Sequence, residues 1–293
     1  MMEWVKNCIE ETKISKVVIS GGVANNIKAN GKLINLPNLK DLFIGGSPGD
    51  DSLSIGSAFC LAEDIFKKNK IVWKSNKVKP LQNLCLGPEP IENMIKSEVK
   101  KLSNIDNLKI IYNITSKELA QFLLDGFIIA RCVGKMEFGQ RALGNRSILA
   151  DPINLEIKEK INSSIKNRDF WMPFAPIIMD KYVDKYLINP KNINSPHMTI
   201  GFETTNLGYE SMKAACHPSD RSARPQILNS NTNIKLYKLL MAFEKLSGRG
   251  ALLNTSFNLH GSPIVNTPKD AIYVFEKSHL DGLLLENILI MRK

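Results

Sequence analysis

Short apolar runs that end in glycine organise the first part of the chain. The β-branched run Lys16-Val17-Val18-Ile19-Ser20 leads into Gly21-Gly22, and Leu42-Phe43-Ile44 leads into Gly45. Such runs predict buried strands that enter glycine turns. A helical stretch follows each turn, and the second stretch carries Leu53, Phe59, Ile65 and Phe66. The pattern therefore predicts two successive units of strand, glycine loop and helix.

The longer second part alternates between helical and strand patterns. A capping box at 115–118 precedes one helix, and 267–270 places a cap and an N1 proline before the last one. Ile157, Ile161 and Ile165 recur every fourth residue, which predicts a helix with an apolar stripe. Strands are expected at 127–133, 251–253 and 283–285. This alternation predicts the α/β or α+β fold class.

A change in composition separates the two parts. Between Val72 and Pro90 the chain is polar and contains three prolines and a glycine, which is typical of a linker. We therefore expect a first unit at 1–75, a linker at 76–95 and a second unit at 96–293.

Composition and charge restrict the class of protein. The 293 residues are 43% hydrophobic and 23% charged, which predicts a soluble globular chain. No apolar run approaches the ~20 residues that span a bilayer, and the first residues lack the apolar stretch of a signal peptide. The five cysteines are scattered without a CxxC pair, as expected for reduced thiols. These features together predict a cytoplasmic location and no membrane partner.

The net charge of +10 leaves alternatives open. Nucleic acid is one possible partner of such a basic chain. The lysines are dispersed in small groups, so a solvated basic surface or anionic small substrates fit the charge better, and nucleic acid is the less favoured alternative.

One loop concentrates the residue types that bind phosphate. Three cations (Lys135, Arg141 and Arg146), three glycines and Ser147 lie within residues 134–147, the glycine-arginine loop. Glycines let backbone N–H groups approach an anion, and arginine forks grip phosphate oxygens in pairs. A polar loop with surface arginines would explain the charges but not the glycine spacing.

Other stretches add candidate contacts. Lys166 and Arg168 follow a helix, where they could equally complement its dipole. Residues 217–226 bring Asp220 and Arg224 into a predicted loop before a strand. Asn254, Ser256 and Asn258 are expected to follow an apolar strand, where short amides and hydroxyls suit a phosphate or a planar urea-like group. An ordinary polar turn fits these residues as well.

The first unit offers weaker signals. Gly21, Gly22 and Asn25 stand where a strand end could approach a nucleotide, although an ordinary tight turn fits as well. Asp50 precedes a helix and could ligate a metal or cap that helix.

Taken together, these stretches resemble the O-carbamoyltransferase family of antibiotic and nodulation-factor biosynthesis. Residues 134–152 resemble that family's signature over its whole length. Pro173-Phe174-Ala175-Pro176, Ala223-Arg224-Pro225-Gln226 and Asn254-Thr255-Ser256-Phe257-Asn258 follow in the family's order. The resemblance covers nearly all of the chain.

The resemblance implies two domains. The carboxyl-terminal one is similar to threonylcarbamoyl-adenylate synthases (YrdC-like, a mixed sheet with helices), which implies that it condenses carbamoyl phosphate with ATP into carbamoyl-adenylate. The amino-terminal one is similar to tRNA threonylcarbamoyl transferases of the actin-like (ASKHA) superfold. It is implied to hold a nucleotide and a metal and to pass the carbamoyl group to an alcohol. The segment 1–75 matches only the last portion of that domain, so the chain is expected to be the family's carboxyl-terminal part.

The candidate residues take roles within this reading. The expected phosphate clamp consists of Lys135, Arg141, Arg146, Lys166, Arg168 and Arg224. The expected substrate-orienting residues are Ser147, Asp220, Asn254, Ser256 and Asn258. By the match, Gly21, Gly22 and Asn25 bind nucleotide and Asp50 ligates the metal. ATP and Mg²⁺ are the expected cofactors, and the acceptor is expected to be a hydroxyl of a sugar or secondary metabolite.

Two departures from the family's pattern stand out. The histidine pair of the family's metal site has no counterpart, so Fe²⁺ or another divalent metal is expected only if the missing amino-terminal part is supplied. Met172 stands where the family has an arginine before Pro173. A fragment, a split-gene product and a decayed copy remain open, and so does a partner subunit that binds nucleotide and needs a separate amino-terminal chain or a homodimer.

Overall fold

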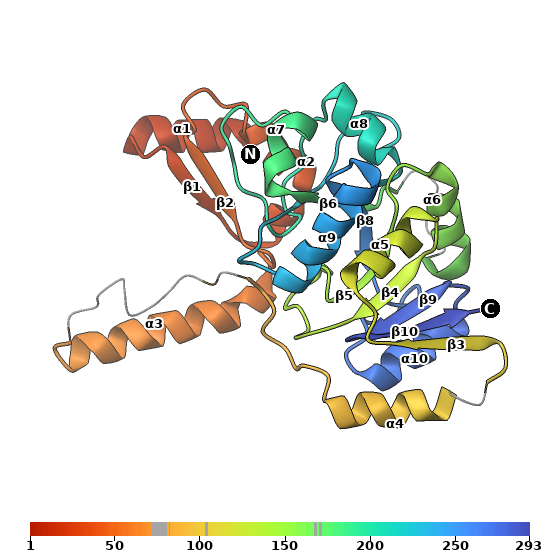
Figure 1. Cartoon of the computed structure of the whole chain (residues 1–293). Helices are drawn as coiled ribbons and strands as arrows, with labels where there is room; N and C mark the ends of the chain where they lie inside the picture. Colours follow the sequence, from red (N-terminus) through yellow and green to blue (C-terminus); the bar gives the residue numbers. More distant parts are fainter. Residues whose placement is uncertain (72–80, 82, 103–104, 167–168, 170–171) are drawn as a thin grey trace.

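The computed structural model of the chain describes residues 1–71, 81, 83–102, 105–166, 169 and 172–293. Figure 1 shows a large sheet with helices, a smaller strand pair beside it and one helix that projects away. The α-helices are α1 Met2–Thr12, α2 Ile27–Leu33, α3 Leu53–Lys68, α4 Glu92–Leu102, α5 Ser116–Leu124, α6 Leu155–Ile161, α7 Val183–Tyr186, α8 Asn206–Met212, α9 Ile234–Ser247 and α10 Pro268–Lys277. The strands are β1 Lys16–Ile19, β2 Asp41–Ile44, β3 Leu108–Tyr112, β4 Ile129–Cys132, β5 Arg146–Ala150, β6 Ala175–Met179, β7 Gln226–Leu228, β8 Ala251–Ser256, β9 Gly282–Leu285 and β10 Ile288–Arg292.

The large sheet has eight strands in the order β3-β10-β9-β4-β5-β8-β6-β7. The pairs β4–β9 and β6–β7 are parallel, and the other neighbours are antiparallel. Helices and mixed strands in one sheet confirm the predicted α/β (α+β) class.

Alternate residues of the central strands face opposite layers of helices. Ile129 and Leu149 pack in one cluster with residues of α5 and α9. Ala130 and Ile148 pack in another with residues of α4, α6 and α10. This is the period of two that a strand imposes on its side chains. Both faces of the sheet are therefore covered by helices. We expect a functional site at the ends of the strands, where side chains are not buried under these helices.

Local signals predicted several element boundaries correctly. The capping boxes at Thr115 and Thr267 are both present, and Pro268 starts α10. The helix expected through Ile165 is α-helical only to Ile161 and continues as a π-helical turn to Lys166. This π-helical turn carries a buried lysine, which is described below.

The first unit forms a two-stranded parallel sheet with α1 and α2. Its hydrophobic cluster includes Leu33 and Leu42 together with Tyr186 and Phe202 from the second part. The approach is close, because a Cβ on Gly31 would lie 2.1 Å from the carbonyl oxygen of Gly201. The two parts therefore share a core, and the boundaries 1–75, 76–95 and 96–293 stay predictions, since much of the expected linker lies outside the described residues.

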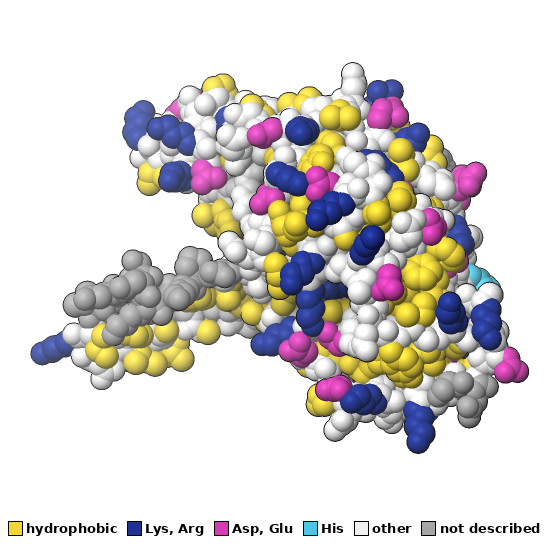
Figure 2. All heavy atoms as spheres, viewed as in Figure 1, with side chains coloured by type: hydrophobic (Ala, Val, Ile, Leu, Met, Phe, Trp, Pro, Cys, Tyr) yellow, Lys and Arg dark blue, Asp and Glu magenta, His cyan; other side chains and the backbone are white. Residues whose placement is uncertain are grey.

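Helix α3 stands apart from this core. None of its residues is buried, and Figure 1 shows it extending away from the sheets. Leu53, Leu61 and Ile65 are exposed, and Figure 2 shows hydrophobic side chains gathered along it. An apolar helix that covers nothing of the described chain is typical of a surface that meets another structure. In the described part of the chain, no helix is long and apolar enough to cross a membrane.

His197 is buried where the first unit meets the second. A Cβ on Gly46 would lie 2.9 Å from its Cγ, and within the described residues neither ring nitrogen has a hydrogen-bond partner. Burial lowers the pKa of His197 to about 4, from its usual 6.5. The folded chain thus favours the neutral imidazole.

We expect His197 to make stability depend on pH. Between pH 6.5 and 4 the unfolded chain binds a proton that the folded chain refuses, so stability falls as pH falls through this window, by up to about 3 kcal/mol. Above pH 6.5 the group adds no pH dependence. Denaturant unfolding at a series of pH values from 4.5 to 7.5 gives the slope of the free energy of unfolding against pH. This slope should be smaller for His197→Phe than for the wild type. The exposed His279→Phe should keep the wild-type slope, and an unchanged slope in His197→Phe would contradict this account.

Candidate functional site

The glycine-arginine loop connects the antiparallel neighbours β4 and β5 at one end of the large sheet. Glu137 lies inside it and is 6% exposed. Its Oε1 accepts hydrogen bonds from the backbone N–H groups of Leu143 and Asn145, each at 2.7 Å, and of Arg146 at 3.3 Å. One carboxylate therefore fixes the conformation of the loop through its backbone N–H groups. Glu137 was not predicted as a site residue, although it is the single acid among the three cations of the loop.

Two amide side chains hold the same loop from the neighbouring strands. Gln226 Nε2 donates to the carbonyl of Leu143, and Asn254 Nδ2 donates to the carbonyl of Ala142, both at 2.9 Å. Asn254 and Ser256 were expected to follow the strand. That expectation is wrong, because β8 continues to Ser256, where it pairs with Ser147 of β5. Pairing between segments far apart in sequence extends the strand.

Arg146 begins β5 and is completely buried. In the described part of the chain its guanidinium donates only to backbone carbonyls, those of Pro88, Val133, Gly134, Asn145 and Asn266. The predicted phosphate-clamp role does not fit this placement. Arg146 is instead a positioning residue that ties three segments of the chain together.

Ser147 and Asp220 also differ from their predicted roles. Ser147 is fully buried, and its Oγ accepts the backbone N–H of Gly144 at 2.9 Å, so it supports the loop. Asp220 pairs with Lys28 on the surface and accepts the N–H of Ser222 at 3.0 Å. Its side chain is about half exposed and faces a different hollow. The structure thus places Asp220 away from the other candidates.

Lys166 joins two of the predicted substrate residues. It is 1% exposed, and its ammonium donates to Ser256 Oγ at 3.1 Å and to Asn258 Oδ1 at 2.7 Å. It also reaches the backbone carbonyls of both residues. Ser256 in turn donates to Asn258 Oδ1 at 2.7 Å. A buried cation, a hydroxyl and an amide are thereby held in one fixed cluster.

A small hollow of about 70 Å³ opens beside this cluster; we call it the arginine hollow. Its walls come from the glycine-arginine loop, from β6 and β8, and from the segment before β7. They are Gln140, Arg141, Ala142, Phe174, Ala175, Met198, Arg224, Asn254, Thr255 and Ser256. Two guanidinium groups at a hollow with hydroxyl and amide walls suit a small planar or tetrahedral anion.

Of the other clamp candidates, Lys135 does not line the arginine hollow. Lys135 is exposed and lies at the start of the loop, where its carbonyl accepts Asn145 Nδ2 at 2.8 Å. Arg168 lies outside the described residues. The structure thus brings together Arg141, Lys166, Arg224, Asn254, Ser256 and Asn258 out of the predicted set.

The candidates of the first unit gather at the carboxyl ends of β1 and β2. Gly21 has φ +98° and donates its N–H to the carbonyl of Pro48 at 2.7 Å, so the two glycine loops lie together. A Cβ on Gly21 or Gly22 would meet nothing within 4 Å, which leaves open space beside them. Asn25 lies next to Gly49, one residue before Asp50.

No metal cluster accompanies Asp50 in the described chain. Within the described ranges, no group of three or more His, Cys, Asp or Glu residues could hold a metal ion. Asp50 starts the short 3-10 helix Asp50–Ser52, and Asp51 is the neighbouring acid in that helix. These residues by themselves do not fit a transition-metal site.

The loop near Asp50 touches the glycine-arginine loop. A Cβ on Gly139 would lie 2.7 Å from Ser47 Cβ and 3.6 Å from the carbonyl oxygen of Gly46. Gly139 also has φ +94°, which favours glycine. The nucleotide and metal candidates of the first unit therefore lie next to the loop that carries Arg141.

Comparison with known sequences identifies the family behind this site. Residues 120–292 match the family described as Carbamoyltransferase C-terminus, and residues 1–59 match the one described as Carbamoyltransferase N-terminus. The chain belongs to the carbamoyltransferase family. Because the first 59 residues match the amino-terminal family, a description of this carbamoyltransferase as a carboxyl-terminal part alone is too narrow.

Curated relatives extend over both parts. The protein MJ1058 of Methanocaldococcus jannaschii is 34% identical over 100% of this chain and 47% of its own length. Nodulation protein NolNO of Sinorhizobium fredii is 30% identical over 97% of this chain and 41% of its own. The 3'-hydroxymethylcephem-O-carbamoyltransferase of Streptomyces clavuligerus is 25% identical over 91% of this chain and 47% of its own length. The chain spans about half the length of these relatives.

Among solved structures, HypF in its phosphate- and nucleotide-bound form aligns with 64% of this chain and 22% of its own at 16% identity, with a TM-score of 0.43. That likeness is too weak to bear on the fold or the function, so the YrdC-like assignment stays a prediction.

Proposed function

We propose that this carbamoyltransferase chain forms carbamoyl-adenylate from carbamoyl phosphate and ATP, for transfer to a hydroxyl group. The observation that carries the proposal is the cluster of Lys166, Ser256 and Asn258 beside the arginine hollow. The cluster combines a fixed cation with neutral donors and acceptors, which suits a carbamoyl group next to a phosphate.

The chemistry consists of displacements at activated centres. Water cleaves carbamoyl phosphate into carbamate and inorganic phosphate. A carbamate oxygen then attacks the α-phosphorus of ATP. The bond between the α-phosphorus and the oxygen that bridges the α- and β-phosphates breaks, and pyrophosphate leaves. Negative charge on phosphate oxygens dominates both steps, so electrostatic stabilisation is the main task of the protein.

The residues of the site divide this task. Arg141 and Arg224 provide the guanidinium groups at the arginine hollow for phosphate oxygens. Lys166 keeps Ser256 and Asn258 in place to orient the carbamoyl group. Glu137 and Arg146 shape the loop from behind. Mg²⁺ would arrive with ATP and neutralise its phosphates.

The hydroxyl acceptor is the next part of the proposal. The names of two relatives refer to nodulation and to O-carbamoylation of a hydroxymethylcephem. We propose a sugar or secondary-metabolite alcohol as the acceptor, which attacks the carbamoyl carbon and releases AMP.

The transfer step is proposed to need a partner that completes the amino-terminal unit, as a separate chain or a further part of the protein. The exposed apolar side chains of Trp4, Val18 and Phe43 on the first unit, and those of α3, provide the surface for it. An unpaired sheet edge with an apolar face is typical of such a contact.

We therefore expect the chain alone to make the adenylate but to carbamoylate no alcohol. Transfer requires the acceptor within about 3–3.5 Å of the activated carbonyl, and the described residues around Asp50 form no metal cluster to polarise it. Mass spectrometry of reactions with ATP, carbamoyl phosphate and aminoglycoside or sugar acceptors should show carbamoyl-adenylate without a carbamoylated acceptor. A carbamoylated product would overturn the partner proposal, and absence of the adenylate would overturn the proposed function.

Met172 allows a gain-of-function test. It lies two residues before Phe174, which lines the arginine hollow. We expect Met172→Arg to tighten carbamoyl phosphate binding about three- to tenfold, since it restores a cation before the hollow. Calorimetric titration measures this, with Met172→Gln as the uncharged control. Unchanged or weaker binding by the arginine variant would show that the segment before Pro173 lies differently from the family's pattern.

A further inference from the structure

A second and larger cavity is lined by residues that contact the glycine-arginine loop. This basic groove has a volume of about 790 Å³, within the usual range for small-molecule sites. It lies among α4, α5, α9 and the ends of β3, β4, β9 and β10, and no residue lines both the basic groove and the arginine hollow. It is therefore a separate place in the fold.

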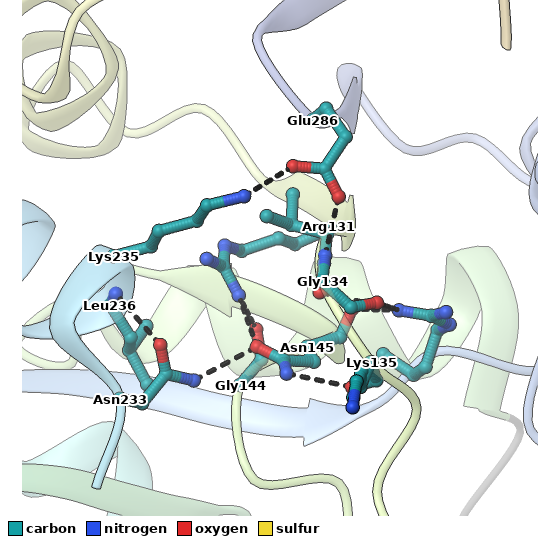
Figure 3. Close-up of polar contacts among 11 residues, drawn as sticks. Arg131, Gly134, Lys135, Gly144, Asn145, Asn233, Lys235, Leu236 and Glu286 are labelled. Atoms are coloured by element: carbon teal, nitrogen blue, oxygen red, sulfur yellow. Dashed lines mark hydrogen bonds and ion pairs between the residues drawn. The ribbon is translucent and has the colours of Figure 1, made fainter. Parts of the chain in front are cut away.

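Arg131 gives the basic groove a buried positive charge. The residue is 3% exposed and lines the groove. Its Nη1 donates to the carbonyl of Gly144 and to Asn145 Oδ1 at 3.0 Å, both neutral acceptors in the loop. In Figure 3 the other two guanidinium nitrogens point away from the loop, and no hydrogen bond joins them to the described residues.

The charges around Arg131 leave a positive surplus. The groove is lined by the cations Lys96, Arg131, Lys235 and Lys238 and the acids Glu92 and Glu286. Lys96 pairs with Glu92 and Lys235 with Glu286, each at 2.6 Å. Glu286 also accepts the backbone N–H of Gly134. Lys238 is exposed and has no ion pair among the described residues. Arg131 is acted on electrostatically by Glu137 and Glu286, but within the described residues it forms no ion pair with either.

The rest of the lining is largely apolar. Ile95, Leu119, Val133, Leu239 and Leu284 contribute to its walls, and the exposed Tyr112 stands at its border. Apolar walls with a few convergent cations suit a ligand that has both a phosphate and a flat apolar part.

We propose that the basic groove binds a nucleotide at a site separate from the arginine hollow, with its phosphates at Arg131 and Lys238 and its base on the apolar wall. Arg131 holds Gly144 and Asn145, and Glu286 holds Gly134, so the occupant contacts residues that support the glycine-arginine loop. The proposal does not depend on the proposed function of the arginine hollow.

The test is a calorimetric titration of the full chain with ADP at low ionic strength, with adenosine as the phosphate-free comparison. Lys238→Ala is expected to weaken ADP binding about tenfold, the equivalent of one lost phosphate contact. Lys245→Ala, an exposed lysine on the same helix outside the groove, should change binding less than twofold. Adenosine should bind much more weakly than ADP.

Arg141→Ala separates the two sites, because Arg141 lines only the arginine hollow. In that background the Lys238-sensitive binding should persist. Equal ADP binding by the wild type and Lys238→Ala, no binding of ADP at millimolar concentration, or equal binding of adenosine and ADP would each overturn the proposal. Loss of all ADP binding in Arg141→Ala would place the nucleotide in the arginine hollow alone and would overturn it as well.

Discussion

Replacing Arg146 with methionine is expected to lower the free energy of unfolding by about 3–5 kcal/mol, because several buried carbonyls lose their donor at once. The methionine fills a similar volume, so the loss reflects hydrogen bonds rather than a cavity. Those carbonyls belong to the segment at Pro88, the loop start at Val133 and Gly134, and the turn at Asn266. Denaturant unfolding followed by circular dichroism measures the change.

Arg141→Met is the matched control, since it makes the same substitution in the same loop. Arg141 is partly exposed at the arginine hollow, so we expect a stability change of about 1 kcal/mol or less and a loss of activity instead. If Arg146→Met were as stable as the wild type, the buried guanidinium would not be the anchor of this loop.

Replacing Lys166 with methionine is expected to lower the rate of pyrophosphate release about 10²–10³-fold, which is typical for the loss of one preorganised charged group. The ammonium contacts both Ser256 and Asn258, so its loss removes a charge and frees two orienting side chains. The effect should fall mainly on kcat, because the cluster is proposed to orient the carbamoyl group for the reaction.

Steady-state kinetics with ATP and carbamoyl phosphate measures the loss of rate. Thermal unfolding of the same sample shows whether the variant is folded, which separates a catalytic defect from misfolding. Lys277→Met, at the end of α10 and outside the cluster, should behave as the wild type. Near-normal turnover by folded Lys166→Met would show that Lys166 has no role in the reaction.

Local sequence signals account for much of the fold. Thr115 and Thr267 marked helix starts because capping is a short-range interaction between a side chain and nearby N–H groups. The runs at 16–20 and 42–45 predicted the positions of β1 and β2. The expectation that these strands are buried is wrong, because Val18 and Phe43 are exposed. The end of α6 and the length of β8 could not be predicted this way, because strand pairing and tertiary packing decide them.

The residues of the candidate site were largely predicted from the sequence. Which of their side chains face the arginine hollow and which are buried was not. Arg141 and Arg146 look alike in sequence, yet one lines the arginine hollow and the other is buried. The register of β5 against β4 and β8 decides which side chain points inward, and that register joins segments far apart in the chain. Glu137 and Arg131 were missed for the same reason, since their partners are backbone groups of the folded loop.

The activity proposed for this chain is the formation of carbamoyl-adenylate. The most direct measurement is pyrophosphate release by the purified chain with ATP and Mg²⁺, with and without carbamoyl phosphate. We predict release that requires carbamoyl phosphate and is lost in Arg141→Met. Release that is absent, or equal with and without carbamoyl phosphate, would contradict the account.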